Sequence, residues 1–211
     1  IASCLVGSEM CIRDRAPRLI EGGLQAAERA RNLVGRLLSF ARRQTLKPQS
    51  VSLAALVEDM RELIARSLGP TIEVQVLVDP ALAPVVVDPH QLELALLNLV
   101  VNARDAMLDG GSLSISAGLA GDGPHRPAGL VGAQLAWLQV RDNGCGMDEE
   151  QLRRCIEPFY STKGVGKGTG LGLPMVQGLA LQSGGGFAIG SQPGQGTEAT
   201  PVSYTHLTLP T

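Results

Sequence analysis

A glycine-rich stretch in the last third of the chain constrains the fold more than any other segment. The sequence GKGTGLGLPM occupies residues 166–175, with a glycine at every second position from 166 to 172. Glycine loses more conformational freedom on folding than any other residue, so this density indicates backbone that adopts special torsion angles or approaches another group closely. Pro174 suits the first turn of a helix, so the loop is predicted to lead directly into a helix.

The composition limits the classes of protein that could contain this loop. The chain has 211 residues, which suits one good-sized domain with an appendage, and its core must be mainly aliphatic because aromatic residues make up 3%. A net charge of −2 argues against a broad basic surface for nucleic acid, and no apolar run is long enough to cross a membrane. The cysteines, Cys4, Cys11, Cys145 and Cys155, show no zinc-ligand spacing, which indicates reduced thiols in a cytoplasmic protein.

The two ends of the chain differ from its middle. Residues 1–15 (IASCLVGSEMCIRDR) and 201–211 (PVSYTHLTLPT) fit poorly with their neighbours, and both resemble translated sequencing-adapter sequence. We expect neither segment to be native and leave both out of the fold prediction. The alternative is an ordinary frayed terminus at each end. On the first interpretation the chain is a fragment whose last native strand is incomplete.

Hydrophobic periodicity predicts a mixture of helices and strands between these ends. Residues 17–45 form one predicted amphipathic helix, whose apolar stripe needs a partner helix to be buried. Further helices are predicted over 52–67, 89–108, 148–155 and 174–182, and strands over 71–79, 85–87, 112–118, 134–142, 186–192 and 196–200. Because the alternation is irregular, we predict an α+β two-layer sandwich, with helices on one face of a mixed sheet.

The predicted helix over 89–108 carries three polar side chains on one face. Asn98, Asn102 and Asp105 follow one another at i, i+4 and i+7 among leucines and valines. Such residues are poor helix formers because their side chains compete for backbone hydrogen bonds, so here they need partners. One interpretation is a buried polar network. The other is a row of oxygen atoms facing a hydrated magnesium ion and a polyphosphate.

A second polar group ends the predicted strand over 134–142. Asp142 is the last residue of this strand and is followed by Gly144 and Gly146 in the sequence VRDNGCGMD. An ordinary turn would explain this pattern. Alternatively, the carboxylate lies at the base of a pocket, where it accepts a hydrogen bond from the exocyclic amine of adenine and rejects the carbonyl group of guanine.

The glycine-rich loop brings positive charge to the start of the next helix. Lys163 and Lys167 lie within STKGVGKGTGLGL, which fits neither a Walker A loop nor a Rossmann fingerprint. Backbone amides freed by glycine, a helix N-terminus near Leu173 and two ammonium groups nevertheless favour phosphate binding. We therefore predict a mobile lid over a nucleotide. The alternative, a disordered linker, is disfavoured by the anchoring residues at 157–159 and 171–176.

Together, four motifs resemble the N, G1, F and G2 boxes of the sensor histidine kinase ATP-binding domain. In order they are NARDA, DNGCG, EPFYSTK and GKGTGLGL. One box alone is a weak signal, whereas four in this order are specific, and the resemblance covers about residues 17–200. It implies the Bergerat fold of gyrase-type, mismatch-repair and chaperone ATPases for residues 48–200. It also implies that residues 16–47 are the second helix of a dimerisation and phosphoacceptor domain whose first helix is missing.

The resemblance implies a role for each matched residue. Asn102 would ligate magnesium, and Asn98 would lie beside it near the phosphates as the second catalytic residue. Asp142 would bind the adenine amine in a pocket shaped by glycines. Phe159 would anchor the lid by packing. The other implied nucleotide-binding residues are Gly144, Gly146, Asp105, Lys163, Lys167, Gly168, Thr169, Gly170, Leu171 and Gly172.

The implied activity is that of a bacterial two-component kinase. The chain would bind Mg-ATP and donate the γ-phosphoryl group to a histidine of a dimerisation domain. Asn98 stands where hydrolysing relatives carry a glutamate base, and an amide cannot accept a proton, which favours transfer over hydrolysis. None of His90, His125 and His206 has the context of a phosphoacceptor, so the acceptor is expected upstream.

The implied partners are ATP, a response regulator or receiver domain, and a second copy of the full-length protein. No nucleic acid or membrane contact is expected from this fragment, and we expect a cytoplasmic domain, with membrane attachment of the full-length protein left open. The sequence is also compatible with two other functions. One is a different kinase or ATPase of the same fold, against which Asn98 and the dimerisation-type helix argue. The other is a non-catalytic nucleotide-binding or dimerisation module, against which the intact motifs argue.

Overall fold

The computed structural model describes residues 46–120, 135–163 and 168–204. The chain divides into two compact units, Ile1–Gln44 and Thr45–Thr211, and the described residues all belong to the second. The helix predicted over 17–45 therefore lies outside the described residues. In the part of the chain that is described, no helix is both long and apolar enough to span a membrane.

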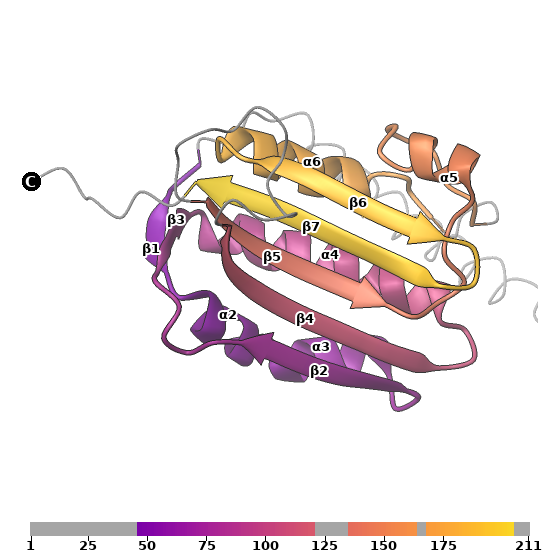
Figure 1. The fold of residues 1–211 in the computed structure, drawn as a ribbon, viewed down its shortest axis with the longest axis horizontal. Coiled ribbons are helices and arrows are strands. Elements are labelled where there is room, and N and C mark those ends of the chain that lie inside the picture. Colours follow the sequence, from indigo (N-terminus) through magenta and orange to yellow (C-terminus); the bar gives the residue numbers. More distant parts are fainter. Residues whose placement is uncertain (1–45, 121–134, 164–167, 205–211) are drawn as a thin grey trace, which may run out of the picture. The chain divides into compact units, whose positions relative to one another are not determined.

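A mixed five-stranded sheet forms one layer of the fold (Figure 1). Its strands are β2 (Ile72–Val78), β4 (Gly111–Ala120), β5 (Leu135–Asp142), β6 (Gly186–Gln192) and β7 (Gly196–Tyr204). They lie in the order β2-β4-β5-β7-β6, and only β2 and β4 are parallel to each other. Parallel neighbours require a crossover connection, which here contains a long helix.

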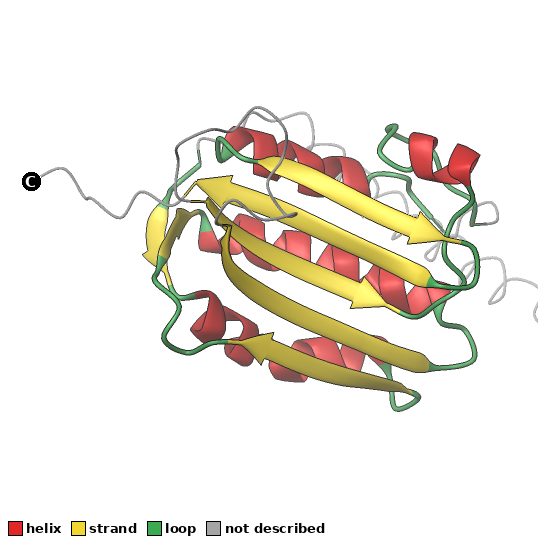
Figure 2. Ribbon diagram, in the orientation of Figure 1, coloured by secondary structure: helices red, strands yellow, loops and turns green. Residues whose placement is uncertain are grey.

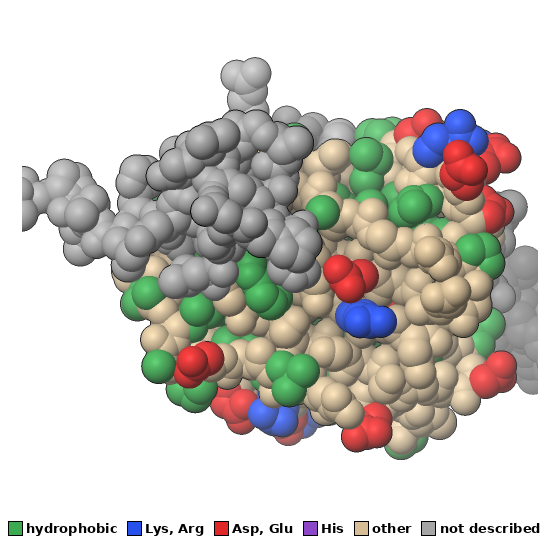
Figure 3. Space-filling view, viewed as in Figure 1, with side chains coloured by type: hydrophobic (Ala, Val, Ile, Leu, Met, Phe, Trp, Pro, Cys, Tyr) green, Lys and Arg blue, Asp and Glu red, His purple; other side chains and the backbone are tan. Residues whose placement is uncertain are grey.

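Helices cover one face of this sheet and leave the other face open (Figure 2). They are α2 (Leu53–Asp59), α3 (Arg61–Leu68), α4 (Pro89–Ala106), α5 (Glu149–Arg154) and α6 (Gly172–Gln182). Where Figure 3 draws no grey residues, this face shows mostly backbone and side chains that are neither hydrophobic nor charged, with scattered hydrophobic and charged side chains between them. The prediction of a two-layer α+β fold with a mixed sheet and helices on one face is confirmed.

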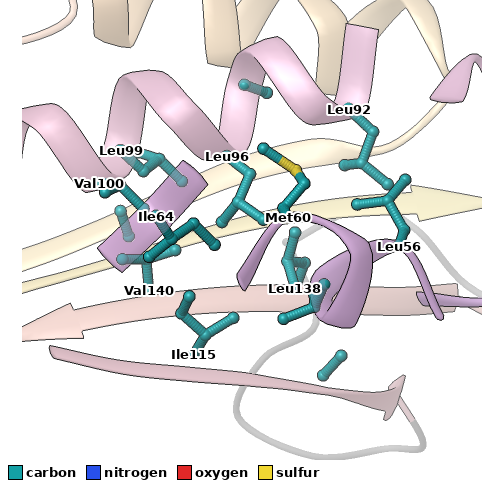
Figure 4. Close-up of a cluster of buried hydrophobic side chains, with 14 of the residues drawn as sticks. Leu56, Met60, Ile64, Leu92, Leu96, Leu99, Val100, Ile115, Leu138 and Val140 are labelled. Carbon is teal, nitrogen blue, oxygen red and sulfur yellow. The ribbon is translucent and has the colours of Figure 1, made fainter. Parts of the chain in front are cut away.

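The core lies between the sheet and the helices α2, α3 and α4 (Figure 4). Leu96 and Val100 of α4 have no exposed surface, and neither have Leu113 and Ile115 of β4. Burying a side chain of this size contributes about 1.5–3 kcal/mol, so the contact fixes α4 firmly on the sheet. The face of α4 that carries Asn98, Asn102 and Asp105 is not part of this core.

Local sequence defines both ends of α4. Asp88 caps its N-terminus by accepting a hydrogen bond from the Gln91 amide at 3.2 Å, and Pro89 occupies the first turn. At the other end, Gly110 has a φ of 91°, and a Cβ there would lie 2.6 Å from the carbonyl oxygen of Thr71. Glycine is therefore required at this turn, which leads the chain into β4.

Three details differ from the sequence-based predictions. The helix predicted over 52–67 consists of two helices, α2 and α3, that meet at Met60. A short strand, β1 (Gln49–Val51), was missed; it pairs antiparallel with β3 (Val85–Val87). The last strand continues past residue 200, so residues 201–204 of the segment left out of the prediction form the end of β7.

Candidate functional site

The polar face of α4 lies against the start of α6. A Cβ at Gly172 would lie 3.3 Å from Asn102 Nδ2 and 3.7 Å from Asn98 Oδ1, so the helix start comes close to both amides. Leu171 precedes α6 without a side-chain capping hydrogen bond, and Pro174 has no N–H group. The first turn of α6 therefore presents backbone N–H groups and the positive end of its dipole beside the asparagines.

Asp105 binds two cationic side chains. Its Oδ2 accepts a hydrogen bond from Lys163 Nζ at 2.6 Å, and its Oδ1 accepts two from Arg104, from Nε at 2.9 Å and from Nη2 at 2.6 Å. Lys163 Nζ also lies 3.3 Å from Asn102 Oδ1. Burial raises the pKa of Asp105, but the hydrogen bonds from Lys163 and Arg104 outweigh this effect and lower the pKa below its usual value.

Asp142 ends β5 and is the most buried charged residue of the site, at 7% exposure. Its Oδ1 accepts hydrogen bonds from the backbone amides of Gly144, at 2.9 Å, and Thr197, at 3.2 Å. Its Oδ2 accepts none from any residue that the structure describes, so one acceptor oxygen is free. Burial raises the pKa of this carboxyl group, and the two amides only partly oppose the shift.

Three glycines hold the backbone tightly around Asp142. Gly146 has a φ of 65°, and a Cβ there would collide with the carbonyl oxygen of Gln192. A Cβ at Gly196, with a φ of 81°, would collide with the carbonyl oxygen of Asp142 itself. A Cβ at Gly144 would lie 2.5 Å from the carbonyl oxygen of Ala106, the last residue of α4. The glycines thus bring the end of β5 against the end of α4 and the β6–β7 turn (Figure 1).

The backbone holds the two ends of the glycine-rich loop together. The amide of Phe159 donates to the carbonyl oxygen of Gly170 at 2.9 Å, and both residues have positive φ. The prediction that Phe159 anchors the loop by side-chain packing is wrong, because its side chain is 62% exposed. The backbone supplies the anchor, since a Cβ at Gly170 would lie 2.6 Å from the carbonyl oxygen of Tyr160. Lys167 lies outside the described residues.

The structure brings most of the predicted site residues together. Asn98 and Asn102 lie beside Gly172, and Lys163 contacts Asn102 and Asp105. Gly168, Thr169, Gly170 and Leu171 connect the described end of the loop to α6. The amide of Thr197 is a partner of Asp142 that the sequence did not predict. No side-chain pattern could have revealed it, because a backbone N–H makes the contact from 55 positions away.

The donor set agrees with magnesium held largely by its substrate. Within the described ranges, no cluster of three or more His, Cys, Asp or Glu side chains could hold a metal ion. Magnesium bound with polyphosphates needs few protein ligands, because phosphate and water oxygens complete its coordination. Asn102 Oδ1 already accepts a hydrogen bond from an ammonium group, so this oxygen is oriented toward a cationic partner.

Comparisons with known proteins agree with this geometry. Residues 87–210 match the family described as histidine kinase-, DNA gyrase B- and HSP90-like ATPases. The sensor kinase CckA of Brucella abortus (strain 2308) is 43% identical over 178 residues, which cover 82% of this chain and 19% of CckA. The sensor histidine kinase ZraS of Klebsiella oxytoca is 34% identical over 171 residues, which cover 81% of this chain and 34% of ZraS. The chain thus spans between a fifth and about a third of these relatives.

Solved structures show the same fold. Full-length ShkA in complex with AMPPNP is similar with a TM-score of 0.66 at 26% identity, over 85% of this chain and 37% of the ShkA chain. The mycobacterial sensor histidine kinase MprB is similar in fold, with a TM-score of 0.58 at 23% identity over 75% of this chain and 97% of that one. From its fold, its site and its match over residues 87–210, the chain belongs to the family of histidine kinase-, DNA gyrase B- and HSP90-like ATPases.

Proposed function

We propose that this chain contains the ATP-binding catalytic domain of a sensor histidine kinase. It binds Mg-ATP and donates the γ-phosphoryl group to a histidine of a dimerisation domain, for onward transfer to a response regulator. The observation that carries the nucleotide assignment is the buried carboxylate of Asp142. Two backbone amides hold one of its oxygens, and the other accepts no hydrogen bond from the described residues. Relatives named as sensor kinases support the reaction type.

The free oxygen of Asp142 suits the exocyclic amine of adenine. A hydrogen bond to a charged acceptor contributes about 1.5–3 kcal/mol, and a guanine carbonyl in the same place would leave two acceptors facing each other. The amides of Gly144 and Thr197 fix the carboxylate, so it cannot rotate freely to avoid such a mismatch. Asp142 therefore favours ATP over GTP.

The phosphates belong beside the first turn of α6. Backbone amides and the helix dipole favour negative charge there, and Asn98 and Asn102 lie within reach of the same place. Asn102 would hold magnesium through its amide oxygen, with Asn98 nearby, and the ion would neutralise charge on the phosphates. Phosphoryl transfer needs mainly such positioning and charge stabilisation.

The side chains around Asn98 favour transfer over hydrolysis. An amide cannot act as a general base near neutral pH. The nearest carboxylate on the same face of α4, Asp105, is hydrogen-bonded to Lys163 and Arg104 and has a lowered pKa, so it is a poor proton acceptor. The nucleophile would then be a histidine of a separate helical domain, in a dimer of the complete protein.

Two measurements on the full chain test this function. Calorimetric titration with ATP and GTP, each with and without magnesium, should show magnesium-dependent binding of ATP and little binding of GTP. Incubation with γ-labelled ATP and a separately produced helical dimerisation domain that carries a phosphoacceptor histidine should then label that histidine in an acid-labile bond. Steady release of phosphate without labelled protein would indicate an ATPase, and no binding of either nucleotide would refute the assignment.

A further inference from the structure

Lys163 links the start of the glycine-rich loop to α4. Its ammonium group lies 2.6 Å from Asp105 Oδ2 and 3.3 Å from Asn102 Oδ1. The Lys163 and Asp105 side chains are only 32% and 23% exposed, so this ion pair is partly shielded from solvent. The ammonium group therefore has a defined place on the polar face of α4.

Packing on both sides keeps the pair in this geometry. Arg104 holds the other oxygen of Asp105 and also donates to the carbonyl oxygen of Ser67 at 3.1 Å, which fixes it to the end of α3. On the loop side, a Cβ at Gly168 would lie 3.2 Å from both Cβ and Cδ of Lys163. Glycine at this position thus leaves the space through which the lysine side chain reaches α4.

The position of the ammonium group conflicts with the proposed role of Asn102. Asn102 would hold magnesium through its Oδ1, and Lys163 Nζ lies 3.3 Å from that same oxygen. Two cations that share one oxygen atom repel each other in a partly shielded site, so the ammonium group opposes magnesium binding there.

We propose that Lys163 is an internal competitor for the magnesium position, and that Asp105 is the positioning residue that holds the ammonium group against Asn102. This inference rests on the proposed function. Binding of magnesium at Asn102 requires that the ammonium group leave Asn102, and the displaced ammonium group becomes available to the phosphates. The amount of free magnesium needed for nucleotide binding is therefore set in part by the Asp105–Lys163 ion pair.

The test is the magnesium dependence of binding by a non-hydrolysable ATP analogue. Calorimetry at a series of free Mg²⁺ concentrations gives the midpoint for the full chain, for Lys163→Met and for Lys163→Arg. The matched control is Lys47→Met, because the exposed Lys47 contacts Asp88 through its backbone amide rather than its side chain. We expect Lys163→Met to lower the free Mg²⁺ concentration at half-maximal binding at least fivefold. Lys163→Arg keeps the positive charge, so its midpoint should lie close to that of the unchanged chain. Lys47→Met should leave the midpoint unchanged.

Contrary outcomes separate this inference from the proposed function. An unchanged midpoint in Lys163→Met would overturn the competition, and so would a loss of analogue binding to the same degree at every magnesium concentration. The second result would mean that Lys163 acts as a phosphate contact alone. Failure of the unchanged chain to bind the analogue would instead refute the proposed function, and the inference with it.

A double-mutant cycle tests the positioning role of Asp105. In the presence of Lys163, Asp105→Asn removes both the anchor of the competitor and an attractive charge, so we expect the midpoint to shift less than twofold. In Lys163→Met the competing ammonium group is already absent, so Asp105→Asn removes only the attraction between the carboxylate and magnesium. The midpoint should then rise severalfold. Asp109→Asn, at an exposed position, is the control. Equal shifts in both backgrounds would overturn the positioning role, and circular dichroism establishes that each variant is folded.

Discussion

Two aspartates of the site, Asp142 at the end of β5 and Asp105 near the end of α4, lie in contrasting surroundings. Asp142 is buried, and among the residues that the structure describes only two backbone amides donate to it, both to the same oxygen. Asp105 is partly exposed, and cationic side chains occupy both of its oxygens. Burial raises the pKa of Asp142, whereas the partners of Asp105 overcome burial and lower its pKa.

This contrast matches two different recognition problems. A neutral, flat base is recognised by a directional acceptor, which a cationic partner would occupy, so Asp142 is held by the backbone instead. When a polyphosphate and its metal ion bind, nearby charged side chains must change partners. Lys163 can exchange its ion pair with Asp105 for a contact with phosphate. The adenine side is thus rigid because its geometry is set by strand ends and glycines, while the phosphate side relies on side chains.

Disrupting the rigid side should have the largest effect. Gly146→Ala places a Cβ against the carbonyl oxygen of Gln192 at a φ of 65°, so we expect a loss of at least about 2 kcal/mol in unfolding free energy, together with loss of ATP binding. Urea denaturation measures the first effect and calorimetry the second. Gly178→Ala in α6, where a Cβ would have no neighbour within 4 Å, should instead gain about 0.5–1 kcal/mol. Equal effects of the two substitutions would argue against a strained turn at Gly146.

The second largest effect is expected when the hydrogen-bonding chemistry of Asp142 changes while the backbone around it stays the same. In Asp142→Asn the amide oxygen can still accept from Gly144 and Thr197, so the fold should persist. An NH₂ group would then face the adenine amine, and we expect affinity for ATP to fall tenfold or more. Calorimetry with Asp109→Asn as the control measures this change. Unchanged affinity would remove Asp142 from the nucleotide site.

The same contrast explains which features the sequence could predict. Asn98, Asn102 and Asp105 share a face because helical spacing is a local property, and alternation over residues 134–142 correctly placed Asp142 at a strand end. Contacts that depend on tertiary structure were not predictable. The Asp105–Lys163 pair joins residues 58 positions apart, and the break at Met60 between α2 and α3 has no proline or glycine to mark it. Phe159 was assigned a packing role from its residue type, but the backbone at this position makes the contact.

Changes on the phosphate side should have little effect on a ligand that lacks phosphates. Asp105→Asn should change the affinity for adenosine less than twofold, whereas Asp142→Asn should reduce it as strongly as it reduces the affinity for ATP. The ion pairs of Asp105 remain partly exposed, and solvent screening limits exposed pairs to roughly 1 kcal/mol or less, so Asp105→Asn should lower the unfolding free energy only slightly. Competition titrations with adenosine measure the first effect. A large loss of adenosine affinity in Asp105→Asn would show that the two regions are not separable.

The smallest effect, and the one that compares the two carboxyl groups directly, is the pH dependence of stability. The folded-state pKa of Asp142 is raised, so the folded chain takes up a proton first as pH falls. From neutral pH down to about pH 4, the unchanged chain should therefore gain stability relative to Asp142→Asn.

The folded-state pKa of Asp105 is lowered, so its contribution to stability is present above the unfolded pKa and is lost as pH falls through the folded value. Below about pH 4, the unchanged chain should lose stability relative to Asp105→Asn. Urea denaturation across this range measures both stability differences. If the two differences changed with pH in the same direction, the pKa values of Asp142 and Asp105 would not be shifted in opposite directions.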